Sequence, residues 1–174
     1  MKNILAILKI LAVFLLTGVC ASAAPVDLPV VTASTVATKK KDVVENGIRT
    51  TVRSTGAEVA WRYFHRPELP FEVQCFFVAK DESTKIQFCW DYQSNKSGEQ
   101  VGKFRFDSKE LTGTGKIIGL GNQFEFPGAK IDGWIIRFVR DGKVIRVTSN
   151  QSHLEQLAKS QDNRLDEIAK EGVR

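Results

Sequence analysis

The sequence lacks most of the groups from which catalytic centres are built. It has only two histidines, His65 and His153, and three cysteines in 174 residues. Two histidines cannot form a three-histidine metal site, and neither of them lies in an H-E-x-x-H pattern. No G-x-S-x-G turn is present either. Zinc-protease and serine-hydrolase patterns are therefore missing, and we expect neither a metal nor a catalytic role.

A complete nucleotide-binding loop is also missing, although the stretch GTGKIIGLG (residues 113–121) contains its ingredients. A P-loop would need glycine in place of Glu110 and a hydroxyl in place of Ile117. The dinucleotide pattern would need glycine in place of Ile118. The next residues are QFEFP, which do not begin a helix whose dipole could hold a phosphate. We interpret the glycines as turn residues between two strands and expect no cofactor.

The chain has little excess charge of either sign. It carries 25 basic and 20 acidic residues, a formal charge of +5, and loss of Lys2 and Lys9 with a cleaved leader lowers that to +3. This is far from the strongly basic surface of a nucleic-acid-binding domain. We interpret the lysine run at residues 39–41 as part of a solvated linker, and we expect no nucleic-acid partner.

The sequence contains one histidine–cysteine pair that could form a reactive base–thiol dyad. His65 and Cys75 lie ten residues apart across the bend predicted by HRPELP. A thiol dyad also needs a third group that orients the base, and no residue identifies itself as that group. The favoured interpretation is that His65 is an ordinary polar residue at a strand end and His153 an exposed residue in the first turn of a helix.

The first residues predict export. Residues 1–23 combine a basic start, an apolar run shorter than the ~20 residues that span a bilayer, and the small-residue site ASA at 21–23. We expect cleavage after Ala23, no transmembrane segment in the mature chain, and a location in the periplasm, on the cell surface or outside the cell. The weaker alternatives are a retained anchor and a lipid on Cys20, which follows Val19 where a lipoprotein has a smaller residue.

The segment after the leader, residues 24–47, has two prolines, no aromatic residue and no helical period. Its composition is typical of a tether. The alternative is a tether with one strand, near Val30 and Val31, that docks on the following domain.

Residues 48–150 read as short strands with one buried face. In EVAWRYF, apolar residues alternate with Glu58 and Arg62, and KFRFD and QFEF show the same alternation. The apolar positions expected to face the core are Val59, Trp61, Tyr63, Phe104, Phe106, Phe124 and Phe126. The fold class that follows is mainly β, an antiparallel β-sandwich (immunoglobulin-like) or an open barrel with a C-terminal amphipathic helix.

The clearest unit is the hairpin GWIIRFVRDGKVIRVTS. Asp141-Gly142 suits a two-residue type I′ turn, which would pair Arg140 with Lys143. Continued without a bulge, this register pairs Phe138 with Ile145 and Ile136 with Val147. It places Trp134, Ile136, Phe138, Ile145 and Val147 in the core, with Arg137 and Arg146 on the opposite, solvated face.

The two cysteines outside the leader, Cys75 and Cys89, are the candidate disulfide. Exported proteins meet an oxidising environment, where paired cysteines usually bond. The hydrophobic pattern points the other way, because setting Phe77 opposite Phe88 turns Cys89 away from the face that holds Cys75. A bulge in the intervening turn could restore the bridge, so both alternatives remain open.

Residues 151–172 predict a C-terminal helix. Ser152-x-x-Glu155 matches a capping box, and leucine and alanine recur at helical spacing. Residues 160–163 could divide the helix in two, and Gly172 is placed to end it. We expect the apolar stripe to pack on the protein's own sheet, with docking of a partner as the alternative.

Three stretches, EVAWRYF, FEVQCFFVAK and GWIIRFVRDGKVIRV, carry a family resemblance. Together with the leader and the terminal helix, they resemble secreted immunoglobulin-like proteins encoded beside type IV pilus genes in mucus-dwelling bacteria, over roughly residues 48–160. The resemblance implies a non-catalytic surface or periplasmic role in pilus assembly or host contact. Cys75 and Cys89 are too close in sequence for an immunoglobulin inter-sheet bond, and the tyrosine corner is absent. No site residue is transferred.

The sequence is therefore compatible with three functions. The first is an exported, non-catalytic binding or assembly module that acts on an unidentified protein or surface ligand. The second is a secreted hydrolase or carbohydrate-active enzyme whose paired carboxylates meet only in the fold. The third is a periplasmic carrier that holds an apolar ligand in a hollow interior.

Overall fold

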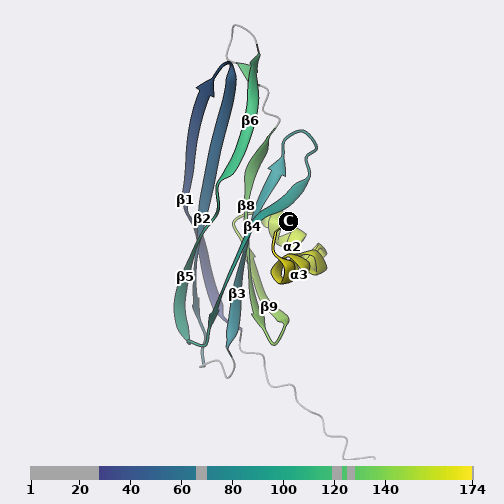
Figure 1. Cartoon of the computed structure of the whole chain (residues 1–174). Coiled ribbons are helices and arrows are strands. Elements are labelled where there is room, and N and C mark those ends of the chain that lie inside the picture. Colours follow the sequence, from purple (N-terminus) through teal and green to yellow (C-terminus); the bar gives the residue numbers. More distant parts are fainter. Residues whose placement is uncertain (1–27, 66–69, 119–122, 125–127, 174) are drawn as a thin grey trace, which may run out of the picture.

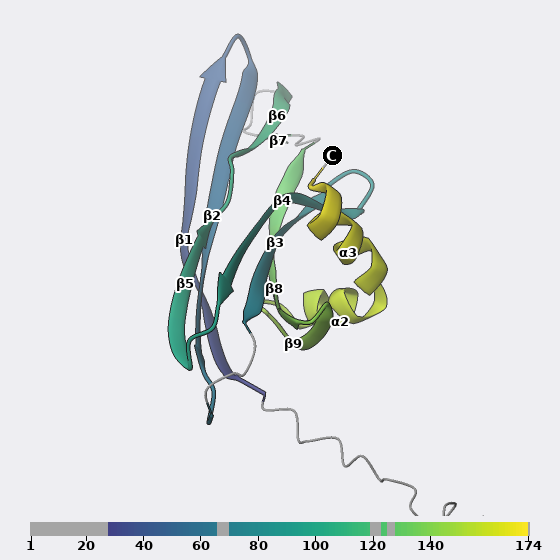
Figure 2. The ribbon, with the colours of Figure 1, turned by 60° about the horizontal axis from the view of Figure 1, so that its bottom comes forward.

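The computed structural model describes residues 28–65, 70–118, 123–124 and 128–173. Within these residues, two antiparallel sheets face each other and do not close into a barrel, and two helices cover the outer face of one sheet (Figures 1 and 2). Of the two predicted architectures, the β-sandwich is therefore confirmed.

The first sheet, sheet A, is built around one long central strand, β2 (Ile48–Arg62). Strand β1 (Val30–Glu45) pairs along one edge of β2. The other edge of β2 is shared by β5 (Val101–Asp107), which pairs with its C-terminal half, and β6 (Leu111–Ile118), which pairs with its N-terminal half. The short β7 (Gln123–Phe124) adds to β6.

The second sheet, sheet B, has the order β4-β3-β8-β9. Its members are β3 (Phe71–Asp81), β4 (Gln87–Ser97), β8 (Ala129–Arg140) and β9 (Lys143–Ser149). Strand β3 reads as a nearly unbroken apolar run because both of its faces are covered, one by sheet A and the other by the helices (Figure 2).

Aromatic side chains fill the space between the sheets. The ring centroids of Trp61 lie 5.5 Å from Phe71 and 4.8 Å from Phe104, and Phe71 stacks on Phe138 at 5.8 Å. The predicted alternation is confirmed for the following core residues: Val59, Trp61, Tyr63, Phe104, Phe106, Trp134, Ile136 and Phe138. Phe126 lies outside the described residues, and nothing is described of the side chain of Phe124.

The segment expected to be a tether is mostly a strand. Strand β1 pairs with β2 from Val30 opposite Arg62 to Glu45 opposite Ile48. An Asn46-Gly47 turn with φ of 49° and 72° closes this hairpin, which is the geometry that a type I′ turn needs. The expected docking strand near Val30 is thus present but 16 residues long. The lysine run lies within it, not in a linker.

The glycine-rich stretch was expected to be a turn, and its first part is a strand instead. Gly113 and Gly115 lie within β6, opposite Thr51 and Arg49. Gly113 is in close contact with Gly128, where a Cβ atom on Gly128 would lie 3.3 Å from the Gly113 Cα. These glycines therefore let the two sheets approach each other. Residues 119–122 lie outside the described residues.

The Asp141-Gly142 hairpin is confirmed at its turn and wrong beyond it. Asp141 and Gly142 have φ of 50° and 71°, and Arg140 pairs with Lys143. A bulge between Phe138 and Val139 then shifts the register, so that Phe138 lies opposite Arg146 and Arg137 opposite Val147. The bulge sends Ile145 into the core between the sheets and Val147 toward the helices.

Arg137 lies on the face of β8 opposite Phe138, as predicted, but that face is not solvated. The relative exposure of Arg137 is 1%. The outer face of sheet B is covered by the C-terminal helices, and Arg137 lies beneath them beside Phe76.

The C-terminal region forms two helices, α2 (Ser152–Ser160) and α3 (Asp162–Glu171), divided where the sequence predicted a break. Their apolar side chains pack against Phe76, Val78 and Ile135 of sheet B, so the expected packing on the protein's own sheet is confirmed. Gly172, with φ of 81°, ends α3 as predicted. No helix in the described ranges is long and apolar enough to cross a bilayer.

The predicted capping box at the start of α2 is not formed. The N-cap is Gln151, and no side chain caps the helix. Ser149 donates its hydroxyl to the Gln151 carbonyl at 2.5 Å instead, so the turn before the helix is held from the strand side.

Candidate functional site

A cleft of about 500 Å³ lies between sheet B and α3. Its floor includes Gln74 and Arg137, and its walls include Glu72, Lys96 and Asp166. Basic and acidic side chains are mixed around it, so the cleft has no strong preference for a ligand of one charge.

Arg137 is the best-buried charge in this cleft. Its Nη2 and Nε atoms donate to Gln74 Oε1 at 2.9 and 3.2 Å, and Nη2 also donates to Asp166 Oδ1 at 2.5 Å. The guanidinium lies 5.2 Å from the ring centroid of Phe76. Arg137 thus joins two strands of sheet B to α3, and the ion pair with Asp166 fixes the helix over the sheet.

Two carboxylates of the cleft, Glu72 and Asp166, already have partners within the protein. Glu72 accepts hydrogen bonds from Gln74 Nε2 at 3.2 Å and from the Tyr92 hydroxyl at 3.3 Å. Burial, and secondarily the negative charge of Glu72, raise the pKa of Tyr92, so Tyr92 stays a donor at neutral pH. Glu72 and Asp166 are the two carboxylates that the hydrolase hypothesis would use.

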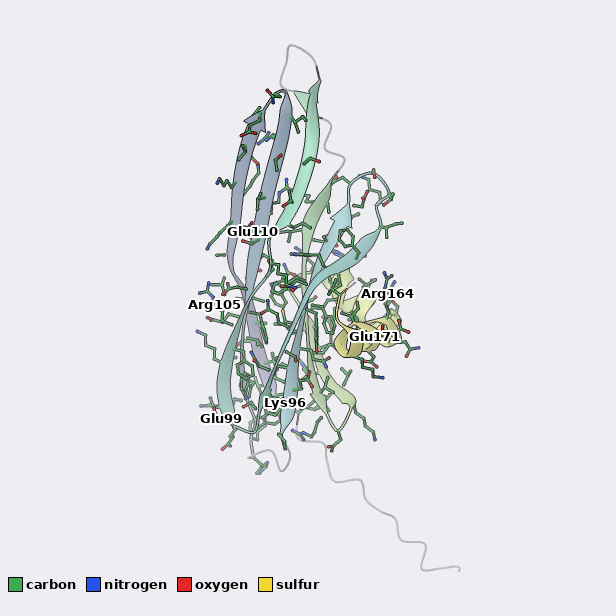
Figure 3. The ribbon with its side chains drawn as sticks, in the orientation of Figure 1. Lys96, Glu99, Arg105, Glu110, Arg164 and Glu171 are labelled. Carbon is green, nitrogen blue, oxygen red and sulfur yellow. The ribbon has the colours of Figure 1, made fainter. Side chains whose placement is uncertain are left out.

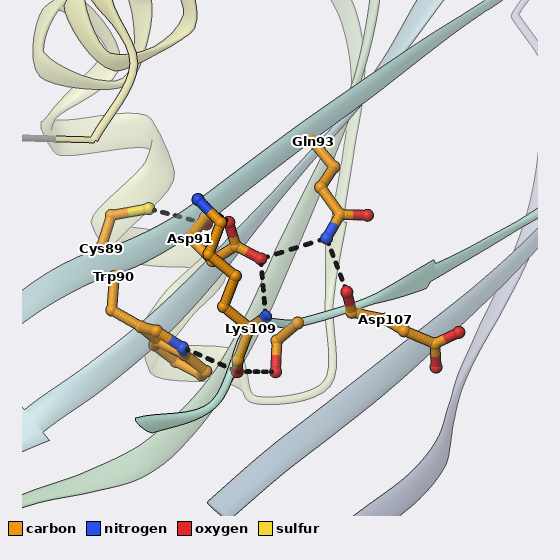
Figure 4. A network of polar contacts seen from close by, with 7 residues as sticks. Cys89, Trp90, Asp91, Gln93, Asp107 and Lys109 are labelled. Atoms are coloured by element: carbon orange, nitrogen blue, oxygen red, sulfur yellow. Dashed lines mark hydrogen bonds and ion pairs between the residues drawn. The ribbon is translucent and has the colours of Figure 1, made fainter. Parts of the chain in front are cut away.

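A second buried polar group, Asp91, connects the two sheets (Figure 4). Its exposed fraction is 1%. Its Oδ2 accepts from the backbone N–H of Lys109 at 2.9 Å and from Gln93 Nε2 at 3.1 Å, while the Lys109 ammonium lies 3.5 Å from Oδ1. Gln93 also donates to the Asp107 carbonyl at 2.6 Å. Strand β4 of sheet B is thereby fastened to the β5–β6 connection of sheet A.

The same connection is fastened to β2 as well. The backbone N–H of Ser108 donates to the Thr55 carbonyl at 2.8 Å, and the Thr55 N–H donates to the Ser108 hydroxyl at 3.0 Å. Trp90 Nε1 reaches the Lys109 carbonyl at 3.4 Å. The hydrogen bonds of Asp91 therefore hold the β5–β6 connection of sheet A against β4 of sheet B. We call this set of contacts between the sheets the latch.

His153 has a partner that the sequence did not reveal. Its Nε2 lies 2.9 Å from Asp132 Oδ2, and Gln87 Nε2 donates to the same oxygen. Although partial burial acts to raise it, the pKa of Asp132 is lowered by these two contacts. This is a histidine–carboxylate pair, but among the described residues no nucleophile bonds to His153, so it links α2 to sheet B without forming a triad.

The two cysteines are free and lie in different layers. Cys75 belongs to the core between the sheets, and Cys89 to the cluster beneath the helices. The predicted opposite orientation is thus observed, although the register differs, because Phe77 lies opposite Asp91 and not Phe88. The structure therefore contains no disulfide between them.

Neither cysteine is activated as a nucleophile, because both thiols stay protonated at neutral pH. Burial raises the pKa of Cys75 well above its ordinary value, and burial raises the pKa of Cys89 to about 12. Cys89 Sγ donates to the Asp91 carbonyl at 3.2 Å. His65 is exposed whereas Cys75 is fully buried, so the weighed dyad is not assembled. Within the described ranges, no group of three or more His, Cys, Asp or Glu residues could hold a metal.

No protein-family model matches this chain, and no curated protein matches its sequence. A solved structure described as a crystal structure from Akkermansia muciniphila matches 74% of this chain and 75% of its own, with 10% sequence identity and a TM-score of 0.28. At that TM-score the two backbones superpose poorly, and the match carries no argument about function.

Proposed function

We propose that the protein is an exported, non-catalytic binding or assembly module of the bacterial cell envelope. The observation that carries the proposal is the use made of its buried polar groups. Asp91 fastens sheet to sheet, and Arg137 fastens helix to sheet. In a catalytic site, buried polar side chains are available to bind a substrate. Here Asp91 and Arg137 form hydrogen bonds to other parts of the protein and hold its layers in place.

The filled interior argues against the carrier hypothesis. Large aromatic side chains, including Trp61, Phe71 and Phe138, occupy the space between the sheets and contact one another. An apolar ligand would have to displace them, and a well-packed core resists such displacement.

The cleft beside α3 keeps an enzymatic function as the second candidate. Glu72 and Asp166 both line it, and paired carboxylates are what glycoside hydrolysis needs. Their bonds to Tyr92 and Arg137 would have to be released before either could act. We therefore rank this function below a binding module.

Incubation with substrates decides between the two candidates. The chain from residue 24 is mixed with glycoside, ester, peptide and phosphate substrates beside a Glu72→Gln variant, whose fold is checked by its melting temperature. We expect no turnover from either protein. Turnover that disappears in Glu72→Gln, while the melt is retained, would overturn the non-catalytic proposal.

The envelope location rests on the leader at residues 1–23, and the pilus association on the resemblance stated for the strands. Expression of the full chain followed by N-terminal sequencing should give Ala-Pro-Val-Asp in the envelope or the medium. An intact Met1 in the cytoplasm contradicts export. Loss of surface pili on deletion of the gene, and their return on complementation, would support the pilus role.

A further inference from the structure

Sheet A extends beyond sheet B at the end where the β1–β2 turn lies (Figures 1 and 2). We call this part the arm and define it as residues 38–53 and 111–116. Its base still contacts sheet B, where Arg53 Nη1 donates to the Ala129 carbonyl at 3.3 Å and Gly113 lies against Gly128. Glu110, labelled in Figure 3, marks its base, where the chain enters β6. Three strands run through it, with β2 in the middle.

The end of the arm exposes aliphatic side chains. Val43, Val44 and Ile48 surround the Asn46-Gly47 turn, and 37%, 56% and 44% of their surfaces are exposed. According to the register, Val43 and Ile48 lie on one face of the hairpin and Val44 on the other, so apolar side chains flank the end of the hairpin on both faces. Exposed apolar groups close to one another usually mark a contact surface. We call these three residues the tip.

More apolar residues occupy register positions at the same end. Lys116 pairs with Ile48, and β6 continues past it to Ile117, which pairs with Phe124 of β7. The strand pairing thus places Ile117 of β6 and Phe124 of β7 at the same end of sheet A as the tip.

Behind the tip lies a collar of basic residues. Lys40, Arg49 and Arg53 share one face of the arm, according to the register of β1 and β2, and Lys39 and Lys41 lie on the other. The arm contains six basic and two acidic residues, which are Lys39, Lys40, Lys41, Arg49, Arg53 and Lys116 against Asp42 and Glu45. Its formal charge is therefore +4 of the chain's +5.

The acid within the collar is already neutralised by its neighbours. Asp42 is paired with Arg49, accepts from the Thr51 hydroxyl at 2.8 Å, and lies 3.1 Å from the Lys40 ammonium. The hydrogen bonds from Arg49 and Thr51 lower the pKa of Asp42, so it remains a carboxylate that orients two cations. The outer lysines stay exposed to solvent.

We propose that the arm docks on an anionic lipid bilayer, with the tip among the headgroups and the collar on their phosphates. The proposal goes beyond the proposed function and rests on it only for the envelope location. Each basic residue near an anionic surface strengthens binding about fivefold. The free edge of β1 carries unpaired backbone groups, so the arm would enter only the interfacial layer, where water still reaches them.

Two other occupants fit the observations less well. A soluble polyanion would contact the collar and leave the tip in water. A second copy of the chain would bring two arms of formal charge +4 together, and like charges at close range repel.

The experiment measures binding to vesicles by flotation. The chain from residue 24 is tested with phosphatidylcholine alone and with a mixture of phosphatidylcholine and phosphatidylglycerol. A tip variant carries Val43→Ser, Val44→Ser and Ile48→Ser, and a collar variant carries Lys39→Gln, Lys40→Gln and Lys41→Gln. Control variants change exposed residues outside the arm, namely Val101→Ser and the triple Lys103→Gln, Lys143→Gln, Lys159→Gln.

We expect binding to the anionic vesicles only. The collar variant should bind about 100-fold more weakly, from three steps of about fivefold, and the tip variant about tenfold or more. Both control sets should bind within about twofold of the parent protein, and circular dichroism should show that every variant is folded. A polarity-sensitive dye on Val44→Cys should shift to the blue with vesicles, and the same dye on Val101→Cys should not.

Several results would overturn the proposal. One is the absence of binding to anionic vesicles by the folded parent protein. Another is a tip variant that binds as well as the parent, since the collar would then be a site for polyanions in general. A third is dimerisation in sedimentation experiments that is abolished by the tip variant. Export is measured separately by N-terminal sequencing, so vesicle binding by a protein that is not exported would sink the envelope function and leave the docking surface standing.

Discussion

Replacing Arg137 with alanine tests whether α3 covers the outer face of sheet B. If that face were in water, as the sequence predicted, truncation would cost almost nothing. The helices cover it instead, and Arg137 is buried beneath α3. The two arrangements therefore predict different losses of stability for the same substitution.

The expected loss follows from the contacts of Arg137. Truncation removes both donors from Gln74 Oε1, and Gln74 is only 6% exposed, so a poorly satisfied buried acceptor costs about 1–3 kcal/mol. The contact with the Phe76 ring adds about 0.5–2 kcal/mol. Asp166 has a side chain that is 45% exposed, so water can solvate it, and the loss stays below that of a fully buried pair. We expect a total of about 2–4 kcal/mol.

Urea unfolding monitored by tryptophan fluorescence measures the difference. A loss near 3 kcal/mol corresponds to a melting temperature lower by about 6–12 °C for a chain of this size. The matched control is Arg146→Ala on the neighbouring strand, where the side chain is exposed and the change should stay within about 0.5 kcal/mol. Arg137→Lys should fall between them, because it keeps the charge but loses the planar fork. Equal losses for Arg137→Ala and Arg146→Ala would refute the burial of Arg137 beneath α3.

Three further outcomes are expected. Asp91→Ala should lower the free energy of unfolding by about 1–3 kcal/mol, because the Lys109 N–H loses its acceptor; a change under about 0.5 kcal/mol in urea would contradict the latch. Cys75 and Cys89 should both alkylate in denaturant without reductant and resist alkylation when folded at pH 8, as seen by intact mass; a disulfide would block the first reaction. Asp81→Ala should lower the melting temperature clearly at pH 6 and much less at pH 2. Hydrogen bonds from Ser83 and Thr84 lower the pKa of Asp81 to about 2, so its contribution is lost as pH falls from about 4 through that value; a difference independent of pH would count against this.

The hydrophobic alternation predicted the sandwich because it depends only on local pattern. Val59, Trp61 and Tyr63 lie on the buried face as expected, and Trp134 and Phe138 are in the core. Each of these positions is determined by the two-residue period of a strand, which does not change with the partner strand.

Register was predicted less well because bulges depend on what covers the other face. Beyond the Asp141-Gly142 turn, the shift at Phe138 and Val139 serves two cores at once, with Ile145 in one and Val147 in the other. In β3–β4, Phe88 lies opposite Ala79 and not Phe77, and a bulge between Phe77 and Val78 then places Phe77 opposite Asp91. A pattern that assumes one buried face has no means of placing such bulges.

The full length of β1 was not predicted, although the sequence contains a signal for the hairpin that it forms with β2. Asn46-Gly47 between two Val- and Thr-containing stretches is the strongest short hairpin signal, and it predicts the observed turn. The lysine run and the low aromatic content favoured a tether. Edge strands often carry lysines, which discourage pairing with other chains, so the composition agrees with the observed place of β1 at the edge of sheet A.

The contacts of the candidate site could not be read from the sequence at all. Arg137 and Asp166 lie 29 residues apart, and Asp91 reaches Lys109 across two sheets. No motif spacing links these residues, because the bonds depend on how the helices and the β5–β6 connection pack after the strands have paired. The only local hint is that Asp91 interrupts an otherwise aromatic strand.

The continuity of β2 has a mechanical consequence. This strand runs without a break from Ile48 in the arm to Arg62 between β1 and β5, so a force applied at the Asn46-Gly47 turn enters the body of the protein with no hinge on the way. Hydrogen bonds in an antiparallel ladder lie across the strands, and a pull along the strand axis therefore loads many of them in shear at the same time. Because β1 and β2 are joined at this turn, they are pulled together, and the hydrogen bonds loaded in shear are those between β2 and its other neighbours, β5 and β6. A molecule held by this end would resist being drawn away through these two ladders, whereas a pull that separates β1 from β2 would open their hydrogen bonds one after another.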